Sequence, residues 1–294
     1  MRLDDEEESS NFEVQSGGGS GFGGGGNLLG LLLPMIGSRF GCGGIAVLLL
    51  LFAVFGGLGN LGSLFTGENV GGGGQQATTS RDAAQLTPTQ HWSLKVLGST
   101  ERTWGRLFQQ AGQQYEPTTL VFYSQSGISG CGAAQSAMGP FYCPMDKKVY
   151  LDTNFFNELQ QRFGAPGDFA QAYVIAHEVG HHIQDLTGTL AKVNAAQRRA
   201  NETEANALQV RTELQADCYA GVWGKETGLM EEGDIEEGLK AAQAIGDDTL
   251  QRDAGRTPMP DSFTHGTSEQ RMHWLKRGLE TGDPTSCDTF GGEV

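Results

Sequence analysis

The sequence predicts an α+β fold that is mainly helical, with a small β-sheet, preceded by one transmembrane helix. Apolar residues recur at spacings of three and four across residues 168–186, which is the period of an amphipathic helix. Residues 203–226 are rich in Ala, Leu, Gln and Glu and are therefore also predicted to be helical. Three short β-prone runs are predicted strands, at residues 120–123, 141–142 and 148–152.

The composition separates N-terminal appendages from one sizeable domain. Residues 1–40 begin with an acidic run and continue as a Gly-rich stretch, so disorder is expected there. Residues 59–87 are rich in Gly, Gln and Thr and are predicted to be a flexible linker, which leaves residues 88–290 as the folded domain. The net charge is −15 and there is no basic patch, so nucleic-acid binding is not expected.

Residues 41–58 are uncharged and dense in Leu, Val and Phe, which predicts a transmembrane helix near the short limit for a span. Arg39 precedes this segment and no Lys or Arg follows until Arg81. By the positive-inside rule, the N-terminus is then cytoplasmic and the large domain extracytoplasmic. The sequence therefore predicts a single-pass protein of the cell membrane.

The cysteine count fits an exported domain. Cys131 and Cys143 bracket a Gly- and Pro-containing loop and could form a local disulfide, while Cys218 and Cys287 could form a long-range one. An even number of cysteines after the predicted span is typical of an oxidising compartment. Three connectivities remain open from sequence alone.

The predicted helix at residues 168–186 carries the motif H-E-x-x-H. His177 and His181 stand four residues apart on one helical face, so both imidazoles can reach one metal ion, and Glu178 is placed to act as a general base. A histidine pair without an acid is more often a satisfied surface pair. His182 is about 100° around the helix from His181, so it is interpreted as a structural or supporting residue. Zn²⁺ is the expected cofactor.

A third zinc ligand is expected in the helical stretch that follows. Glu213 and Asp217 are also four residues apart, so both project from one face. Glu213 is predicted to bind the metal, and Asp217 to accept the N–H of His177 and fix its tautomer. Glu202 and Glu204 are rival acids, and an ordinary exposed acidic face is the simplest alternative.

These motifs resemble those of gluzincin zinc metallopeptidases. The longer strings AYVIAHEVGHHIQDLTG, RTELQADCYAGVW and DSFTHGTSEQR closely resemble the bacterial putative neutral zinc metallopeptidase family, as does CGAAQSAMGPFYCPMDKKVYLDTNFF upstream. The resemblance covers about residues 88 to 288. It implies a zincin-like metallopeptidase domain, with His177, His181 and Glu213 as zinc ligands and Glu178 as the catalytic residue, and a peptide or protein as substrate.

Hydrolysis of a peptide bond also needs a group that stabilises the oxyanion. Tyr219, His265 and Arg271 are the candidates. His265 precedes a Gly turn and a predicted helix at residues 268–280, which a Thr267–Gln270 capping box would begin. One of the predicted strands could bind an extended peptide along its edge.

Two other functions compete with a membrane-anchored zinc metallopeptidase. One is a membrane-tethered binding or scaffold protein that retains a zinc site. A structural zinc site usually has four protein ligands and has no use for Glu178, which argues against this alternative. The other is a zinc hydrolase of a non-protein amide, which the metal ligands alone do not distinguish from a peptidase.

Overall fold

The computed structural model describes residues 1–16, 78–80, 83–292 and 294. Its described helices are α3 (Pro88–Gln110), α4 (Asn154–Gln161), α5 (Asp168–Leu186), α6 (Thr189–Gln197), α7 (Glu202–Thr227), α8 (Asp234–Ala244), α9 (Asp247–Asp253) and α10 (Ser268–Thr281). Its strands are β1 (Phe12–Ser16), β2 (Thr78–Ser80), β3 (Thr119–Phe122), β4 (Ser126–Ser129), β5 (Gly132–Gln135), β6 (Phe141–Cys143) and β7 (Lys148–Leu151). The prediction of a mainly helical domain with a small sheet is confirmed.

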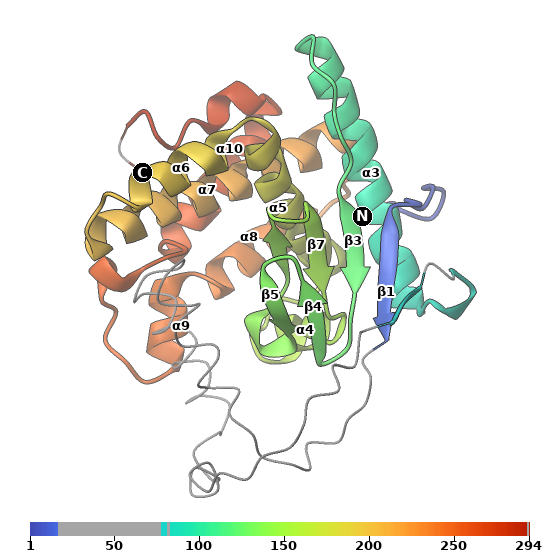
Figure 1. Cartoon of the computed structure of the whole chain (residues 1–294), viewed down its shortest axis with the longest axis horizontal. Coiled ribbons are helices and arrows are strands. Elements are labelled where there is room, and N and C mark those ends of the chain that lie inside the picture. The colour runs from blue at the N-terminus through green and yellow to red at the C-terminus, as the bar shows by residue number, and fades with distance from the viewer. Residues whose placement is uncertain (17–77, 81–82, 293) are drawn as a thin grey trace, which may run out of the picture.

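The main sheet has the strand order β2-β1-β3-β7-β6, and β4 and β5 form a separate hairpin. The β1, β3 and β7 strands are parallel, whereas β6 is antiparallel to β7 and forms one edge. Leu120 and Phe122 join the main core, while Val121 and Tyr123 pack on the opposite face with Ala134 of β5. In Figure 1, α5 lies between the strands and the group of helices from α6 to α10.

The acidic N-terminal segment is part of the folded domain over residues 1–16, which corrects the expectation of disorder there. Basic residues of α3 hold it in place: Arg102 pairs with Glu6, and the Lys95 ammonium donates to the Leu3 carbonyl over 2.9 Å. Residues 78–80 of the expected flexible linker pair with β1 as β2. The composition argument failed because it weighed the segment alone, without the partners that α3 and β3 supply.

The transmembrane helix of the predicted fold is also corrected. Among the described residues, no helix is long and apolar enough to cross a membrane. The predicted span at residues 41–58 lies outside the described residues.

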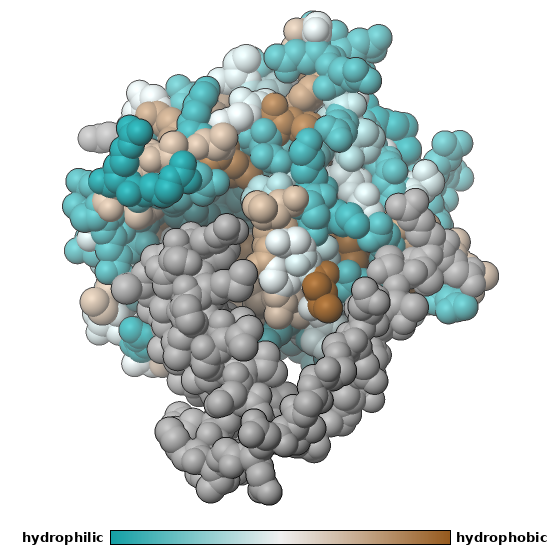
Figure 2. All heavy atoms as spheres, in the orientation of Figure 1, coloured by the Kyte–Doolittle hydropathy of each residue, from teal (hydrophilic) through white to brown (hydrophobic). Residues whose placement is uncertain are grey.

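The visible surface of the described residues is mostly hydrophilic, as expected for a chain with a net charge of −15 (Figure 2). The large hydrophobic side chains exposed in the described residues come from different elements, and they are Ile128, Met138, Met145, Ile235 and Met259. Single exposed apolar residues are ordinary on soluble domains. They therefore carry no functional argument here.

Two glycines allow α7 and α10 to cross closely. A Cβ on Gly278 would lie 2.0 Å from the Cys218 carbonyl oxygen and 2.7 Å from the Val222 nitrogen, and Gly221 faces the same crossing. Because these obstacles are backbone atoms, they cannot rotate away. The crossing fixes α7, which carries the acidic residues of the candidate site, against α10.

We expect Gly278→Ala to destabilise the protein by about 1–3 kcal/mol, because the added methyl group must push the backbones of α7 and α10 apart. Gly105→Ala on α3 is the matched control, since nothing lies within 4 Å of a Cβ built there. That control should be neutral or stabilise by about 0.4–1 kcal/mol. Urea unfolding of the two variants measures the difference, and equal midpoints would contradict the packing argument.

Candidate active site

Three potential metal-binding atoms converge between α5 and α7. His177 Nε2 lies 3.2 Å from Glu213 Oε2, and His181 Nε2 lies 3.5 Å from the same oxygen. One ligand atom from each of these residues falls within 4.8 Å of the others. His177 and Glu213 are buried and His181 is nearly so. The structure therefore brings the three predicted metal-binding residues together.

Gly180, which lies inside the H-E-x-x-H motif, allows α5 and α7 to approach each other closely. A Cβ on Gly180 would lie 2.9 Å from the Ala216 carbonyl oxygen and 3.0 Å from its Cα. Gly180 of α5 thus packs against Ala216 of α7, which lies between Glu213 and Asp217. A larger residue at this position would separate His181 from Glu213.

The remaining ring nitrogens of the two histidines each face a buried acceptor. His177 Nδ1 lies 2.8 Å from Asp217 Oδ1, and His181 Nδ1 lies 2.8 Å from Gln184 Oε1. Acceptors at Nδ1 fix the tautomer in which Nε2 carries the lone pair. Two imidazole Nε2 atoms and one carboxylate oxygen are a ligand set that suits zinc. The residues present therefore fit the expected metal.

Asp217 is the centre of a buried polar cluster. It is fully buried, and Arg271 donates to its two oxygens over 2.8 and 2.9 Å. The Tyr173 hydroxyl donates to Asp217 Oδ1 over 2.6 Å and accepts from Arg271 over 3.2 Å. The predicted contact of Asp217 with His177 is present. Arg271 was a candidate for oxyanion stabilisation, but its guanidinium is engaged with Asp217 instead.

The electrostatics of the cluster favour the charged forms of its histidine and carboxylate members. Burial alone would lower the pKa of His177, but the charge of Asp217 and hydrogen bonds to Asp217 and Glu213 raise it to about 10. Burial opposes ionisation of Asp217, yet Arg271 and His177 lower its pKa to about 2. The pKa of Glu213 is likewise held well below its usual value against burial, first by the charge of His181. Both carboxylates are therefore ionised at neutral pH.

We expect Asp217→Asn to weaken zinc binding by about 10–100-fold, because the substitution removes the charge that orients His177. The amide keeps the shape of the side chain, so packing is preserved. Glu202→Gln is the control, because Glu202 is an exposed acid on the same helix and was a rival ligand. Chelator competition measures both affinities. Equal affinity in wild type and Asp217→Asn would remove Asp217 from the site.

Glu178 lies at the position expected for a general base. It is buried, with 7% of its surface exposed, and follows His177 directly on α5. Burial lowers the pKa of His181, whereas the nearby carboxylates of Glu213 and, more weakly, Glu178 raise it. The charge of Glu178 thus acts on the same group of ligand atoms. Gln209 donates to the second oxygen of Glu213 over 2.9 Å and orients that carboxylate.

His265 lies in the loop that precedes α10, close enough for the charge of Glu213 to act on it. Its Nδ1 lies 3.2 Å from Asp247 Oδ1, while Asp247 Oδ2 accepts the backbone N–H groups of Thr264, His265 and Gly266. The side chain is 42% exposed. Burial lowers the pKa of His265, but the hydrogen bond and charge of Asp247, and then the charge of Glu213, raise it. His265 is therefore a partly exposed hydrogen-bond donor whose orientation is fixed by Asp247.

Other candidates lie elsewhere. The Tyr219 ring packs edge-on against Trp104 of α3, with ring centroids 5.4 Å apart, and burial followed by the charge of Asp288 raises its pKa to about 12. It follows Asp217 by two positions and so lies roughly 200° around α7 from it. Its contacts are those of a core residue, so the structure does not bring it to the site. Glu204 forms the capping box of α7 with Asn201.

His182 has the structural role that its helix position predicted. It is fully buried, its Nε2 lies 2.6 Å from the Glu116 carbonyl oxygen, and its Nδ1 lies 3.1 Å from the Tyr142 hydroxyl. Burial, the largest cause, lowers its pKa. It therefore joins α5 to β6 and to the segment before β3, away from the metal ligands.

Sequence reasoning missed four supporting residues: Tyr173, Gln184, Gln209 and Asp247. Three of them stand three or four positions from a site residue on the same helix, so helical spacing could have found them. Asp247 lies 18 positions before His265 and offered no such signal.

Both predicted disulfides are present, Cys131–Cys143 and Cys218–Cys287.

The fold and site define a mainly helical α+β protein with an H-E-x-x-H helix and a glutamate on a neighbouring helix that could complete a metal site. The chain belongs to the putative neutral zinc metallopeptidase family, which it matches over residues 1–290. The family resemblance seen in the sequence is therefore confirmed, and the match includes the N-terminal segment.

Relatives of this chain are found in several bacteria. The chain is 48% identical over 258 residues to the uncharacterized protein YpfJ of Escherichia coli (strain K12), covering 86% of this chain and 88% of that protein. It is 45% identical over 188 residues to the uncharacterized proteins Mb2605 of Mycobacterium bovis and Rv2575 of Mycobacterium tuberculosis. Those matches cover 59% of this chain and 62% of each relative. No solved structure matches the chain.

Proposed function

We propose that this protein is a zinc-dependent metallopeptidase that hydrolyses peptide bonds with Glu178 as its general base. The observation that carries the proposal is the convergence of His177 Nε2, His181 Nε2 and Glu213 Oε2 beside a buried glutamate. These three residues would hold the zinc. When bound, zinc lowers the pKa of water towards about 7 and polarises a carbonyl group.

The residues of the chain then divide the chemistry between them. The Glu178 carboxylate accepts the proton of the attacking water and transfers it to the leaving amine. The His265 imidazole, held by Asp247, donates a hydrogen bond to the oxyanion that forms from the carbonyl oxygen. Asp217 and Gln184 keep the two histidine rings in the orientation that presents Nε2.

The sheet offers one edge next to the active-site helix. Among the described strands, β7 lies between β3 and β6, so β6 forms the edge of the sheet on this side, and β6 contacts α5. We propose that an extended peptide pairs with β6. Hydrogen exchange on adding a non-cleavable peptide analogue tests this, with slower exchange expected at residues 141–143. Unchanged exchange there would contradict strand pairing.

The two disulfides support an oxidising, extracytoplasmic location for the domain.

Activity is tested by incubating the protein with a denatured protein mixture, with and without a zinc chelator, and reading new N-termini by mass spectrometry. Chelator-sensitive cleavage is expected. Cleavage that persists in the chelator would contradict a zinc mechanism, and chelator-sensitive hydrolysis confined to non-protein amides would identify a different hydrolase.

A further inference from the structure

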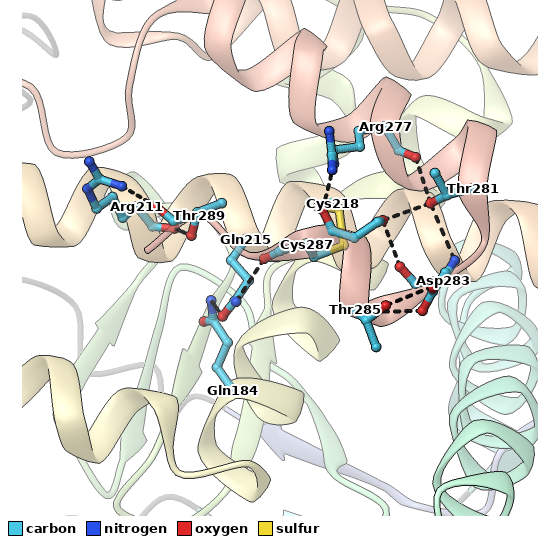
Figure 3. The surroundings of a disulfide bond; sticks show 11 residues. Gln184, Arg211, Gln215, Cys218, Arg277, Thr281, Asp283, Thr285, Cys287 and Thr289 are labelled. Atoms are coloured by element: carbon cyan, nitrogen blue, oxygen red, sulfur yellow. Dashed lines mark hydrogen bonds between the residues drawn. A yellow bond between two sulfur atoms is a disulfide. The ribbon is translucent and has the colours of Figure 1, made fainter. Parts of the chain in front are cut away.

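A buried chain of hydrogen bonds connects the C-terminal segment to His181. The Cys287 carbonyl accepts from Gln215 Nε2 over 2.9 Å, and Gln215 Oε1 accepts from Gln184 Nε2 over 3.1 Å. Gln184 Oε1 then lies 2.8 Å from His181 Nδ1. Figure 3 shows Gln184 and Gln215 directed from their helices towards Cys287.

The direction of donation along this chain is fixed from its outer end. A backbone carbonyl only accepts hydrogen bonds, so Gln215 must turn its NH₂ group to Cys287 and its oxygen to Gln184. Gln184 must then present its NH₂ group to Gln215, and the Thr212 carbonyl, 2.7 Å from the same nitrogen, requires the same orientation. Only the oxygen of Gln184 remains for His181, so Nδ1 carries the proton and Nε2 the lone pair.

Burial of these residues fixes the donor-to-acceptor direction of the hydrogen bonds. Gln184 is fully buried, Cys287 is 1% exposed and Gln215 is 7% exposed. A buried amide that lost its partners would leave polar groups unsatisfied, so the alternative orientation is disfavoured at each step. Through this series of hydrogen bonds, the position of the Cys287 carbonyl determines the tautomer of His181, a predicted zinc ligand.

The position of Cys287 is itself fixed by covalent and polar links to two helices. Cys287 ends the 3₁₀ helix η5 (Pro284–Cys287), and its disulfide partner Cys218 lies three residues after Gln215 on α7. Arg277 of α10 donates to the Ser286 carbonyl over 2.6 Å. Beyond Cys287, the Thr289 hydroxyl donates to the Arg211 carbonyl over 2.7 Å (Figure 3).

We propose that Gln184, Gln215 and the disulfide-bound C-terminal segment are positioning elements for the zinc ligand His181. This inference rests on the zinc site proposed above. It gives the Cys218–Cys287 disulfide a role in metal affinity that the Cys131–Cys143 disulfide does not share, because only the former holds a residue of the hydrogen-bond chain.

The test measures zinc affinity of the full chain by chelator competition. Gln184→Leu keeps the side-chain volume but removes the acceptor, so zinc binding should weaken by about 10–100-fold. Gln215→Leu should weaken binding in the same direction as Gln184→Leu. The His181 tautomer, read from ¹⁵N chemical shifts of the zinc-free protein at a pH at which this imidazole is neutral, should change from mainly Nδ1–H in wild type towards a mixture in both Leu variants.

The disulfides supply the matched comparison. Cys218→Ser with Cys287→Ser should weaken zinc binding, whereas Cys131→Ser with Cys143→Ser should leave it unchanged. If the former pair does not fold, the glutamine variants and their tautomer readout decide the question. Wild-type affinity and tautomer in both Leu variants, or equal effects of the two disulfide pairs, would overturn the inference. A wild-type protein that binds no zinc would overturn the zinc site, and the inference with it.

Discussion

Glu178→Gln should retain zinc and lose hydrolysis, with kcat/KM for a cleaved peptide reduced by about 10²–10⁴-fold. The amide has the size and polarity of the carboxylate but cannot accept the proton of the attacking water. The three predicted ligands, His177, His181 and Glu213, are untouched, so metal content should stay at the wild-type level. Cleavage kinetics and elemental analysis on the same preparation give both values.

The control for Glu178→Gln is Glu158→Gln on α4. Glu158 is an acid outside the ligand cluster, and its substitution should change neither zinc content nor kcat/KM. Wild-type turnover by Glu178→Gln would contradict the general-base role. Loss of zinc from that variant would instead assign Glu178 to the metal site.

Glu213→Ala should bind zinc far more weakly than wild type, and activity should be lost in parallel. The substitution removes one of three ligand atoms and leaves His177 and His181 without the carboxylate that they share. A metal held by two imidazoles alone lacks the ligand number that zinc sites in enzymes use. Chelator competition and elemental analysis measure the loss.

Glu213→Gln separates ligand identity from packing, because the amide fills the same space but is a weaker zinc ligand than a carboxylate. We expect it to fold as wild type does and to bind zinc with an affinity between those of wild type and Glu213→Ala. Normal zinc content in Glu213→Ala would show that a different residue completes the site.

The sequence predicted the centre of the site because its signals are local. Helical spacing places His177 beside His181, and Glu213 beside Asp217, whatever the rest of the chain does. The start and end of α5 and the capping box of α10 were predictable for the same reason. The approach of α5 to α7 through Gly180 needed the tertiary structure.

The errors concern contacts between distant segments. The acidic run at the N-terminus is folded because α3 supplies Arg102 and Lys95, and β1 finds β3 more than a hundred residues away. That pairing is invisible to composition, which is why disorder was expected in the N-terminal segment. Arg271 seemed available for an oxyanion because its buried partner Asp217 is remote in sequence.

The most direct test of the central claim is the zinc stoichiometry of the purified full chain, followed through removal and return of the metal. We predict one zinc per chain, loss of cleavage of denatured proteins when a chelator removes it, and recovery of cleavage when one equivalent of zinc is restored. A chain that contains no zinc and does not take it up, or that cleaves peptides equally well without it, would contradict the account.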